Sequence, residues 1–305
     1  MNPSRILSTV LLALTGCLVT HAAEPGAKAK LPVAVSLPPY AWLAERIGGD
    51  KLAVISLLEE GEDPHSFQPP PRRVTTLSAA KVWFTVAMPF EEALVEKLKG
   101  TTPGLRIVPV NEGIELAESE EHDHHDHEKE APAEKEHKDE PHHDGETDPH
   151  TWLSPILLKQ QAHTIAHTLG EVDAPNAAFY EDNAVALEKE LDALHASLTE
   201  SLAPLKGTTI YVFHPAFGYF ARAYGMTQES IETKGREPSA KHLTALINEA
   251  KEEGVKLILV QPQFSQASAE KMAKAIGATV HPVNDLGRDV LATLRALGDA
   301  VKASR

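Results

Sequence analysis

The sequence predicts an α/β protein with two parallel-sheet halves joined by a long helix. The chain has 305 residues, of which 42% are hydrophobic, and this length favours two domains over one. Short β-branched runs alternate with amphipathic stretches along most of the chain, which is the pattern of βαβ units and parallel sheets. Near the middle, one amphipathic stretch is much longer than the others and divides the alternating pattern in two.

The first half of the alternating pattern predicts an N-terminal α/β lobe over residues 31–172. Its four candidate strands are β-branched and apolar, at residues 33–36, 52–58, 82–86 and 106–110. Its candidate helices show apolar residues at helical spacing, at residues 39–47, 74–80, 90–99 and 154–169.

The stretch 173–204 predicts a rigid linker helix. Asp173 and Pro175 are typical start signals, and Pro204 is a typical stop signal. Apolar residues recur between them at spacings of three and four, namely Ala184, Leu187, Leu191, Leu194, Leu198 and Leu202. Roughly 28 residues at 1.5 Å each span about 40 Å, enough to run the length of a two-lobed protein.

The second half predicts a C-terminal α/β lobe over residues 205–305. Its candidate strands lie at residues 209–213, 256–260 and 279–283, and its candidate helices lie at residues 216–224, 240–253 and 267–276.

The chain begins with a predicted export signal. Arg5 precedes an apolar run over residues 6–14 that is too short to span a membrane. Leu14-Thr15-Gly16-Cys17 resembles a lipobox, so residues 1–16 could be removed and Cys17, the single cysteine, lipidated. Alternatively, cleavage after Thr20-His21-Ala22 would remove residues 1–22 and leave a soluble protein. In neither case does the mature chain have a disulfide or a thiolate ligand, so nitrogen and oxygen must hold any metal.

The segment 117–147 differs in composition from the rest of the chain. From Glu118 to Asp148 there are 14 acidic residues and three lysines, a net charge of −11, which leaves −4 of the total −15 for the remainder. This acidity argues against nucleic acid as a partner. The segment also contains seven histidines: His122, His124, His125, His127, His137, His142 and His143. Because it has no apolar periodicity, we predict a disordered loop that binds metal weakly and exchangeably.

Three other histidines form the candidate metal site. His65 and His150 each end an Asp-Pro-His triplet, and His214 is followed directly by Pro215. His65 and His214 follow predicted strands, and ligands of open parallel sheets bind just beyond the strand ends. Neighbouring prolines restrict the backbone and so reduce the disorder that binding must remove. Three neutral imidazoles suit Zn²⁺ in a tetrahedral site.

A tetrahedral zinc site needs a fourth ligand, and the sequence leaves three candidates. Asp285 follows the predicted strand 279–283 and could supply an oxygen, as could water or, less readily, Glu60. Asp285 could equally be the N-cap of a helix that starts near Leu286.

Six motifs occur in an order that resembles the zinc/manganese solute-binding proteins of ABC importers. The resemblance extends from about Leu31 to the C-terminus. The motifs are Gly61-x-Asp63-Pro64-His65-x-Phe67-Gln68-Pro69, Asp148-Pro149-His150-x-Trp152-Leu153-Ser154-Pro155, Phe213-His214-Pro215-Ala216-Phe217-Gly218-Tyr219-Phe220, Glu237-Pro238-Ser239, Gln261-Pro262-Gln263-Phe264-Ser265 and Asn284-Asp285-Leu286-Gly287.

The resemblance implies two Rossmann-like lobes joined by a rigid helix, with the metal in the cleft between them. His65, His150 and His214 match the family's three histidine positions. Manganese-type members resemble this pattern but carry a carboxylate at the third position, so His214 favours zinc. The histidine-rich insertion also resembles the zinc branch. Gln68 replaces a glutamate common among relatives, and the last motif departs from their Asp-Pro-Leu.

We therefore predict a non-catalytic, extracytoplasmic Zn²⁺-binding protein that delivers the ion to an ABC permease in the cytoplasmic membrane. We expect a monomer that touches the membrane only through a possible lipid anchor. A protein of the same fold serving Mn²⁺ or Fe²⁺ is the main alternative, and a zinc store without a transporter is another. A zinc-dependent hydrolase is the alternative from another class, and it would need an open coordination position and a positioned acid or base.

Overall fold

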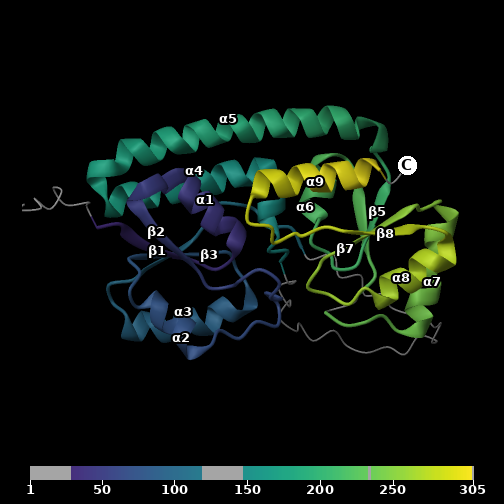
Figure 1. Ribbon diagram of the computed structural model, residues 1–305, viewed down its shortest axis with the longest axis horizontal. Coiled ribbons are helices and arrows are strands. Elements are labelled where there is room, and N and C mark those ends of the chain that lie inside the picture. The colour runs from purple at the N-terminus through teal and green to yellow at the C-terminus, as the bar shows by residue number, and fades with distance from the viewer. Residues whose placement is uncertain (1–28, 119–146, 233–234, 304–305) are drawn as a thin grey trace, which may run out of the picture.

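The computed structural model describes residues 29–118, 147–232 and 235–303 and contains two four-stranded sheets, one in each lobe (Figure 1). The strands of the N-terminal sheet are ordered β2-β1-β3-β4, and those of the C-terminal sheet β6-β5-β7-β8. All neighbouring strands are parallel, so the predicted fold class is confirmed. The N-terminal strands are β1 (Leu31–Val35), β2 (Leu52–Ser56), β3 (Val82–Thr85) and β4 (Arg106–Pro109). The C-terminal strands are β5 (Thr209–Val212), β6 (Thr227–Ser230), β7 (Leu257–Val260) and β8 (Thr279–Pro282).

The central strands are buried because helices cover both faces of each sheet. Val33 of β1 lies opposite Val54 of β2 and Val82 of β3. All four residues of β3 and all four of β7 are buried. A strand buried on both faces has a continuous apolar sequence rather than an alternating one, which explains why these runs were visible in the sequence.

The helices of the N-terminal lobe all begin with proline in the first turn, where the missing N–H costs no hydrogen bond. They are α1 (Pro38–Gly48), α2 (Pro71–Leu77), α3 (Pro89–Thr101) and α4 (Pro155–Val172). Figure 1 shows α1 and α4 above this sheet, against the long helix, and α2 and α3 below it. A short 3₁₀ turn, η2 (Thr151–Leu153), leads into α4.

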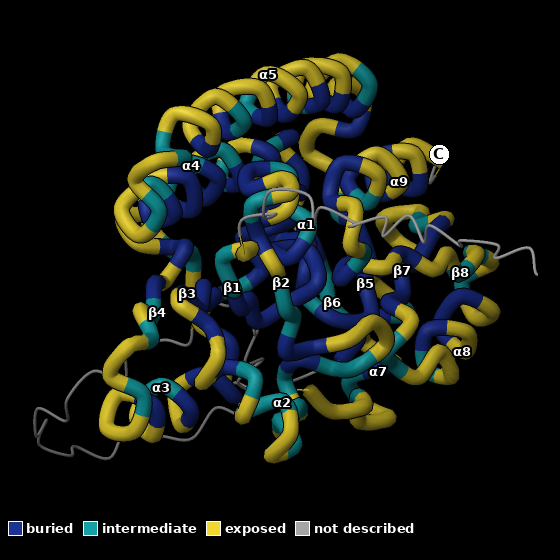
Figure 2. The backbone as a smooth tube through the Cα atoms, turned by 60° about the vertical axis from the view of Figure 1, so that its left-hand side comes forward, coloured by how far each residue is buried: buried dark blue, intermediate teal, exposed yellow. Residues whose placement is uncertain are grey.

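The long helix α5 (Ala177–Leu202) lies along the top of both lobes (Figure 1). The leucines picked out by their spacing are buried on its inner side, while its outer side is exposed (Figure 2). The helix begins later than predicted, because residues Ala174–Asn176 form a 3₁₀ turn. The side chains of Asn176 and Tyr180 both donate hydrogen bonds to Asp173 Oδ2, which stabilises this turn. The domain boundaries drawn at residues 172 and 204 stay a prediction.

The C-terminal lobe contains one strand that the sequence did not reveal. Its helices are α6 (Gly218–Ala223), α7 (Ala240–Glu252), α8 (Ala267–Ile276) and α9 (Val290–Lys302). Strand β6 has the polar sequence Thr-Gln-Glu-Ser and lies at the edge of the sheet, so it carries no apolar run. The helix expected near Leu286 begins at Val290, and its N-cap is Asp289, whose side chain accepts from Ala292 N; the N-cap alternative for Asp285 is wrong.

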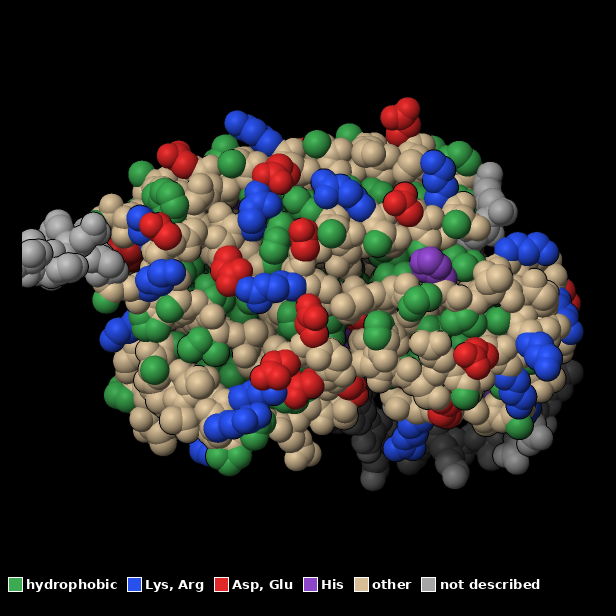
Figure 3. All heavy atoms as spheres, viewed as in Figure 1, with side chains coloured by type: hydrophobic (Ala, Val, Ile, Leu, Met, Phe, Trp, Pro, Cys, Tyr) green, Lys and Arg blue, Asp and Glu red, His purple; other side chains and the backbone are tan. Residues whose placement is uncertain are grey.

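The larger of two hydrophobic clusters among the described residues extends through both lobes, and the smaller one lies within the C-terminal lobe, between its sheet and α7 and α8. The larger cluster contains residues of both sheets, α1, α4, α5 and α9. Trp152 Nε1 donates to the backbone carbonyl of Asp285 at 2.7 Å, and Arg288 pairs with Glu45 of α1 at 2.6 Å. Lys, Arg, Asp and Glu side chains are interspersed over the face seen in Figure 3. No helix in the described part of the chain is long and apolar enough to cross a membrane. The predicted export signal lies outside the described residues.

Candidate metal centre

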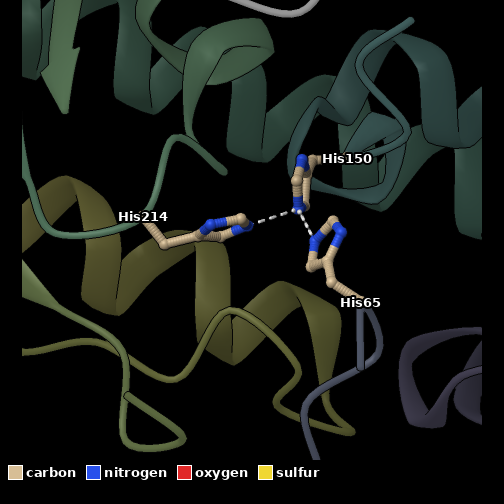
Figure 4. Close-up of side chains that lie close together, drawn as sticks. All are labelled: His65, His150 and His214. Atoms are coloured by element: carbon tan, nitrogen blue, oxygen red, sulfur yellow. Dashed lines mark hydrogen bonds between the residues drawn. The ribbon is translucent and has the colours of Figure 1, made fainter. Parts of the chain in front are cut away.

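Three histidines that are far apart in the sequence meet between the lobes. His65 lies on the loop after β2, His150 directly precedes η2, and His214 follows the end of β5. Within the described residues, these form the one group of histidine, cysteine and acidic side chains whose ligand atoms all lie within 4.8 Å of one another. The Nε2 atom of His150 lies 3.4 Å from that of His65 and 3.2 Å from that of His214 (Figure 4).

These distances match what a single zinc ion requires. Nitrogen ligands lie about 2.0–2.1 Å from Zn²⁺, so two ligands at the tetrahedral angle are about 3.3 Å apart. The two measured Nε2 separations differ from this spacing by about 0.1 Å. His150 is therefore spaced from both of the other histidines as two ligands of one zinc ion would be, and all three ligand atoms lie within 4.8 Å of one another.

His214 is fixed by buried partners on both its backbone and its ring. Gln261 is fully buried and contacts the backbone of His214 twice: its Oε1 accepts from His214 N at 3.3 Å and its Nε2 donates to His214 O at 2.9 Å. The Nδ1–H of His214 donates to Glu232 Oε1 at 2.5 Å, which leaves Nε2 for the metal. The ring of Phe264 packs on the imidazole at a centroid distance of 4.8 Å.

His150 is fixed by the aspartate of its own Asp-Pro-His triplet. Asp148 Oδ1 accepts from the backbone N–H of His150 at 3.0 Å and from its Nδ1–H at 2.8 Å. Both side chains are buried, and Trp152 packs beside the imidazole at 5.1 Å between ring centroids. The Nε2 of His150 therefore points into the site in the correct tautomer.

His65 is held differently, through its loop rather than its ring. Asp63 Oδ1 accepts from the backbone N–H of His65 at 3.0 Å. Burial, together with the neighbouring imidazoles of His150 and His214, lowers the pKa of His65 to about 2. The ring is therefore neutral near pH 7, the state in which imidazole binds a metal.

The histidines open into a cavity of about 910 Å³ between the lobes. Its walls include Asp63, Met88, Glu91, Glu232 and Phe264. The carboxylates of Asp63 and Glu232 in this wall favour a cation over an anion inside the cavity.

The structure does not bring the predicted fourth ligands into the histidine group. Asp285 is buried close by, but its Oδ1 accepts from Gln263 Nε2 at 2.8 Å. Burial raises the pKa of Asp285, against the opposing influence of Gln263 and of the two imidazoles of His214 and His150. Glu60 is exposed in the turn after β2.

Sequence reasoning missed the groups behind the ligands. Glu232 lies two residues after the end of the polar strand β6, where no local pattern marks it. Gln261 directly follows β7 and was visible only as the first residue of a motif, with no indication of its contact with His214. Asp148 was visible as part of a repeated triplet, but its contact with Nδ1 was not. The seven histidines of segment 117–147 and the lipidation candidate Cys17 lie outside the described residues.

The family model, several relatives and the structures with the highest TM-scores are zinc-uptake proteins. The family model "Zinc-uptake complex component A periplasmic" (ZnuA) matches residues 33–299. The high-affinity zinc uptake system protein ZnuA of Bacillus subtilis is 29% identical over 285 residues, which are 91% of this chain and 85% of the relative. A crystal structure of ZnuA superimposes with a TM-score of 0.80 at 34% identity, covering 90% of this chain and 99% of that one. A zinc-bound ZnuA deletion mutant gives a TM-score of 0.79 at 34% identity, covering 90% and 98%.

Proposed function

The chain belongs to the family of the periplasmic zinc-uptake component ZnuA, and we propose that its zinc ligands are His65, His150 and His214. It is a zinc-binding solute-binding protein of an ABC uptake system and acts outside the cytoplasmic membrane. Zn²⁺ is its cargo, bound in the cavity and passed to a membrane permease. The observation that carries the ligand assignment is the convergence of the three histidines within 4.8 Å, with the Nε2 of His150 at zinc-like spacing from the other two.

The ligand set favours Zn²⁺ over Mn²⁺ and Fe²⁺. Imidazole nitrogen suits zinc, whereas manganese prefers carboxylate and water oxygens. We expect purified protein to bind one Zn²⁺ tightly in competition with a chromophoric chelator, and Mn²⁺ at least about 100-fold more weakly. Equal affinities for the two metals would contradict the assignment of three nitrogen ligands.

Asp285 is our proposal for the fourth ligand. It is buried beside the histidines, and its carboxylate is bonded to a neutral amide, so a bound cation would supply the missing positive charge. To reach the metal, the carboxylate must turn away from Gln263. We expect Asp285→Asn to weaken Zn²⁺ binding by roughly 10- to 100-fold, less than the loss of a histidine ligand, because the amide keeps an oxygen that can face the metal but carries no charge. An unchanged dissociation constant would assign the fourth position to water.

The partners follow from the family, which works with an ABC permease and its ATPase. We propose further that the protein is a monomer and that a lipid on Cys17 anchors it. Sedimentation at micromolar concentration tests the first point. Mass spectrometry of membrane-extracted protein, compared with Cys17→Ser, tests the second, and a soluble unmodified chain beginning at residue 23 would contradict the anchor.

The histidine-rich segment is proposed as a collector of zinc. Its acidic residues raise the local cation concentration, and its imidazoles bind Zn²⁺ transiently. Deleting residues 120–146 should reduce the number of weakly bound ions and slow uptake at limiting zinc, while the tight site remains. Unchanged stoichiometry and uptake would identify the segment as a spacer.

The family is one of transport proteins rather than enzymes. We propose that the cavity catalyses no hydrolysis, because the roles of its polar groups are to hold or orient ligands. Zinc-loaded protein should give no turnover with ester, phosphoester or peptide substrates above the rate of the His150→Ala variant. A rate that depends on His150 would support a hydrolase instead.

A further inference from the structure

Tyr219 of the C-terminal lobe connects three separate parts of the molecule through one hydroxyl group. Its oxygen accepts a hydrogen bond from the backbone N–H of Ala117 at 3.0 Å. Its O–H donates to the backbone carbonyl of Asp148 at 2.9 Å. Asp148 N–H in turn donates to the carbonyl of Ala117 at 2.9 Å. A single side chain of α6 thus holds both ends of the histidine-rich insertion.

The residue that Tyr219 holds is the one that orients a proposed zinc ligand. The backbone of Asp148 is bonded to Tyr219, while its carboxylate accepts both hydrogen bonds from His150. The position of the Asp148 backbone sets the position of that carboxylate. A shift of the backbone would therefore change the direction in which His150 presents Nε2.

The rest of α6 packs closely around the same aspartate. A Cβ atom on Gly218 would lie only 3.2 Å from Asp148 Oδ2 and 2.9 Å from Gln228 Nε2, so the backbone of α6 comes close to the aspartate at this point. Arg222 lies over the ring of Tyr219 at 4.9 Å, and its Nη2 is 3.8 Å from Asp148 Oδ2. The hydroxyl of Tyr219 is thus one of several α6 groups that surround the buried Asp148.

We propose that Tyr219 is a positioning residue of the zinc site, acting through Asp148 on His150. It lies in the lobe opposite Asp148 and does not belong to the group of ligands. Its hydroxyl keeps the start of the insertion, the Asp148 backbone and α6 in one arrangement, and this arrangement aims His150 at the ion. The inference rests on the proposed zinc-binding function and adds a residue to it.

The test is the single-atom change Tyr219→Phe in the full-length chain. It removes the hydroxyl and retains the ring beneath Arg222. We expect the dissociation constant for Zn²⁺ to rise about tenfold, the low end for a group behind a ligand. The visible absorption of the Co²⁺-loaded protein should also shift, because the direction of His150 changes.

Tyr224→Phe is the matched control. Tyr224 directly follows α6, is similarly buried, and bonds through its hydroxyl to His195 at 3.2 Å, with no contact to Asp148. We expect this variant to keep the wild-type zinc affinity within about twofold and the wild-type Co²⁺ spectrum. Equal losses in both variants would attribute the effect to general loosening of α6 and overturn the proposal, as would unchanged affinity in Tyr219→Phe.

A double-variant cycle tests whether Tyr219 acts through Asp148. If it does, Tyr219→Phe should weaken binding further by less than about twofold once Asp148→Asn is present. Fully multiplicative losses would overturn the route through Asp148. Failure of the wild-type chain to bind one Zn²⁺ would instead overturn the proposed function, so the two failures are distinguishable.

Discussion

Two of the three histidines have their rings oriented by a buried carboxylate, and the third does not. His150 and His214 each donate their Nδ1–H to a buried carboxylate, and aromatic rings pack on both. Within the described residues, His65 has no carboxylate bonded to its ring, and it is more exposed than the other two. The rigid pair lies at the lobe interface, whereas His65 lies on a long loop after an edge strand.

This difference indicates how the site exchanges its ion. A ring that is already oriented loses little freedom when it binds, so His150 and His214 contribute most of their interaction to affinity. The ring and loop of His65 must become ordered when the metal binds. The entropy lost in this step reduces the contribution of His65 to zinc affinity. We expect the ion to enter and leave on the side of His65.

Removal of single histidine ligands should give the largest losses of Zn²⁺ affinity. These losses test directly whether His65 differs from the other two. A zinc site worth roughly 10–16 kcal/mol with about four ligands gives about 2.5–4 kcal/mol each, or roughly 10²- to 10³-fold in affinity. We expect His150→Ala and His214→Ala to fall at the upper end and His65→Ala at the lower end, in chelator competition. A loss for His65→Ala as large as for the other two would contradict the asymmetry.

Glu91 shows what a buried carboxylate does when no imidazole is bonded to it. Its oxygens accept from the backbone N–H groups of Val86 and Met88, yet burial raises its pKa from 4.5 to about 7. Folded protein therefore holds this proton more tightly than unfolded protein does. The contribution of Glu91 to stability is full below pH 4.5 and declines as the pH rises to 7, by about 3 kcal/mol.

Denaturant unfolding of metal-free protein at several pH values can measure this decline, with Glu91→Gln as the reference. The free energy of unfolding of the wild type, relative to the variant, should fall between pH 4.5 and 7. Parallel pH profiles for the two proteins would contradict the raised pKa.

Removing the carboxylate that accepts from the His214 ring tests whether orienting a histidine ring contributes to zinc affinity. Glu232→Gln should weaken Zn²⁺ binding by roughly 10- to 100-fold, because Nδ1 loses its charged acceptor. Asp63→Asn is the matched change at His65, where the carboxylate contacts only the backbone of the histidine. We expect an effect of about twofold there, since an amide oxygen can accept the same hydrogen bond. Similar losses of Zn²⁺ affinity in Glu232→Gln and Asp63→Asn would contradict the distinction between ring-bonded and backbone-bonded carboxylates.

The smallest predicted effect concerns the support of the His65 loop. Arg73 donates to the carbonyl of Leu57 at 2.8 Å, pairs with Glu62 at 2.5 Å and lies over the ring of Phe67 at 5.4 Å. Arg73→Met should loosen the loop and weaken Zn²⁺ binding by about three- to fivefold, equivalent to roughly 1 kcal/mol. The neighbouring exposed Arg72, changed to Met, should leave the affinity unaltered.

The sequence predicted those helices and strands whose buried residues form a regular apolar pattern along the chain. Buried strands such as β3 and β7 are continuous apolar runs, and the leucine spacing of α5 follows its buried side. Strand β6 escaped because an edge strand with a polar sequence has no such pattern. Because this strand was not predicted, Glu232, two residues beyond its end, was not recognised either.

The ligands themselves could be predicted, but their supports could not. His65, His150 and His214 stand beside prolines in ordered motifs. The ring partner of His150 lies two residues away in its own triplet, but that of His214 follows an unpredicted strand, and in both cases only the folded backbone shows the contact with Nδ1. Asp285 illustrates the limit: it is buried near the site as expected, yet Gln263 holds its carboxylate.

The most direct test of the account is X-ray absorption at the zinc edge of protein that lacks residues 120–146 and carries one equivalent of Zn²⁺. The account predicts three imidazole nitrogens at about 2.0–2.1 Å, falling to two in each of the His65→Ala, His150→Ala and His214→Ala variants. A nitrogen count of one or none in the parent protein, or a count unchanged by these substitutions, would contradict it.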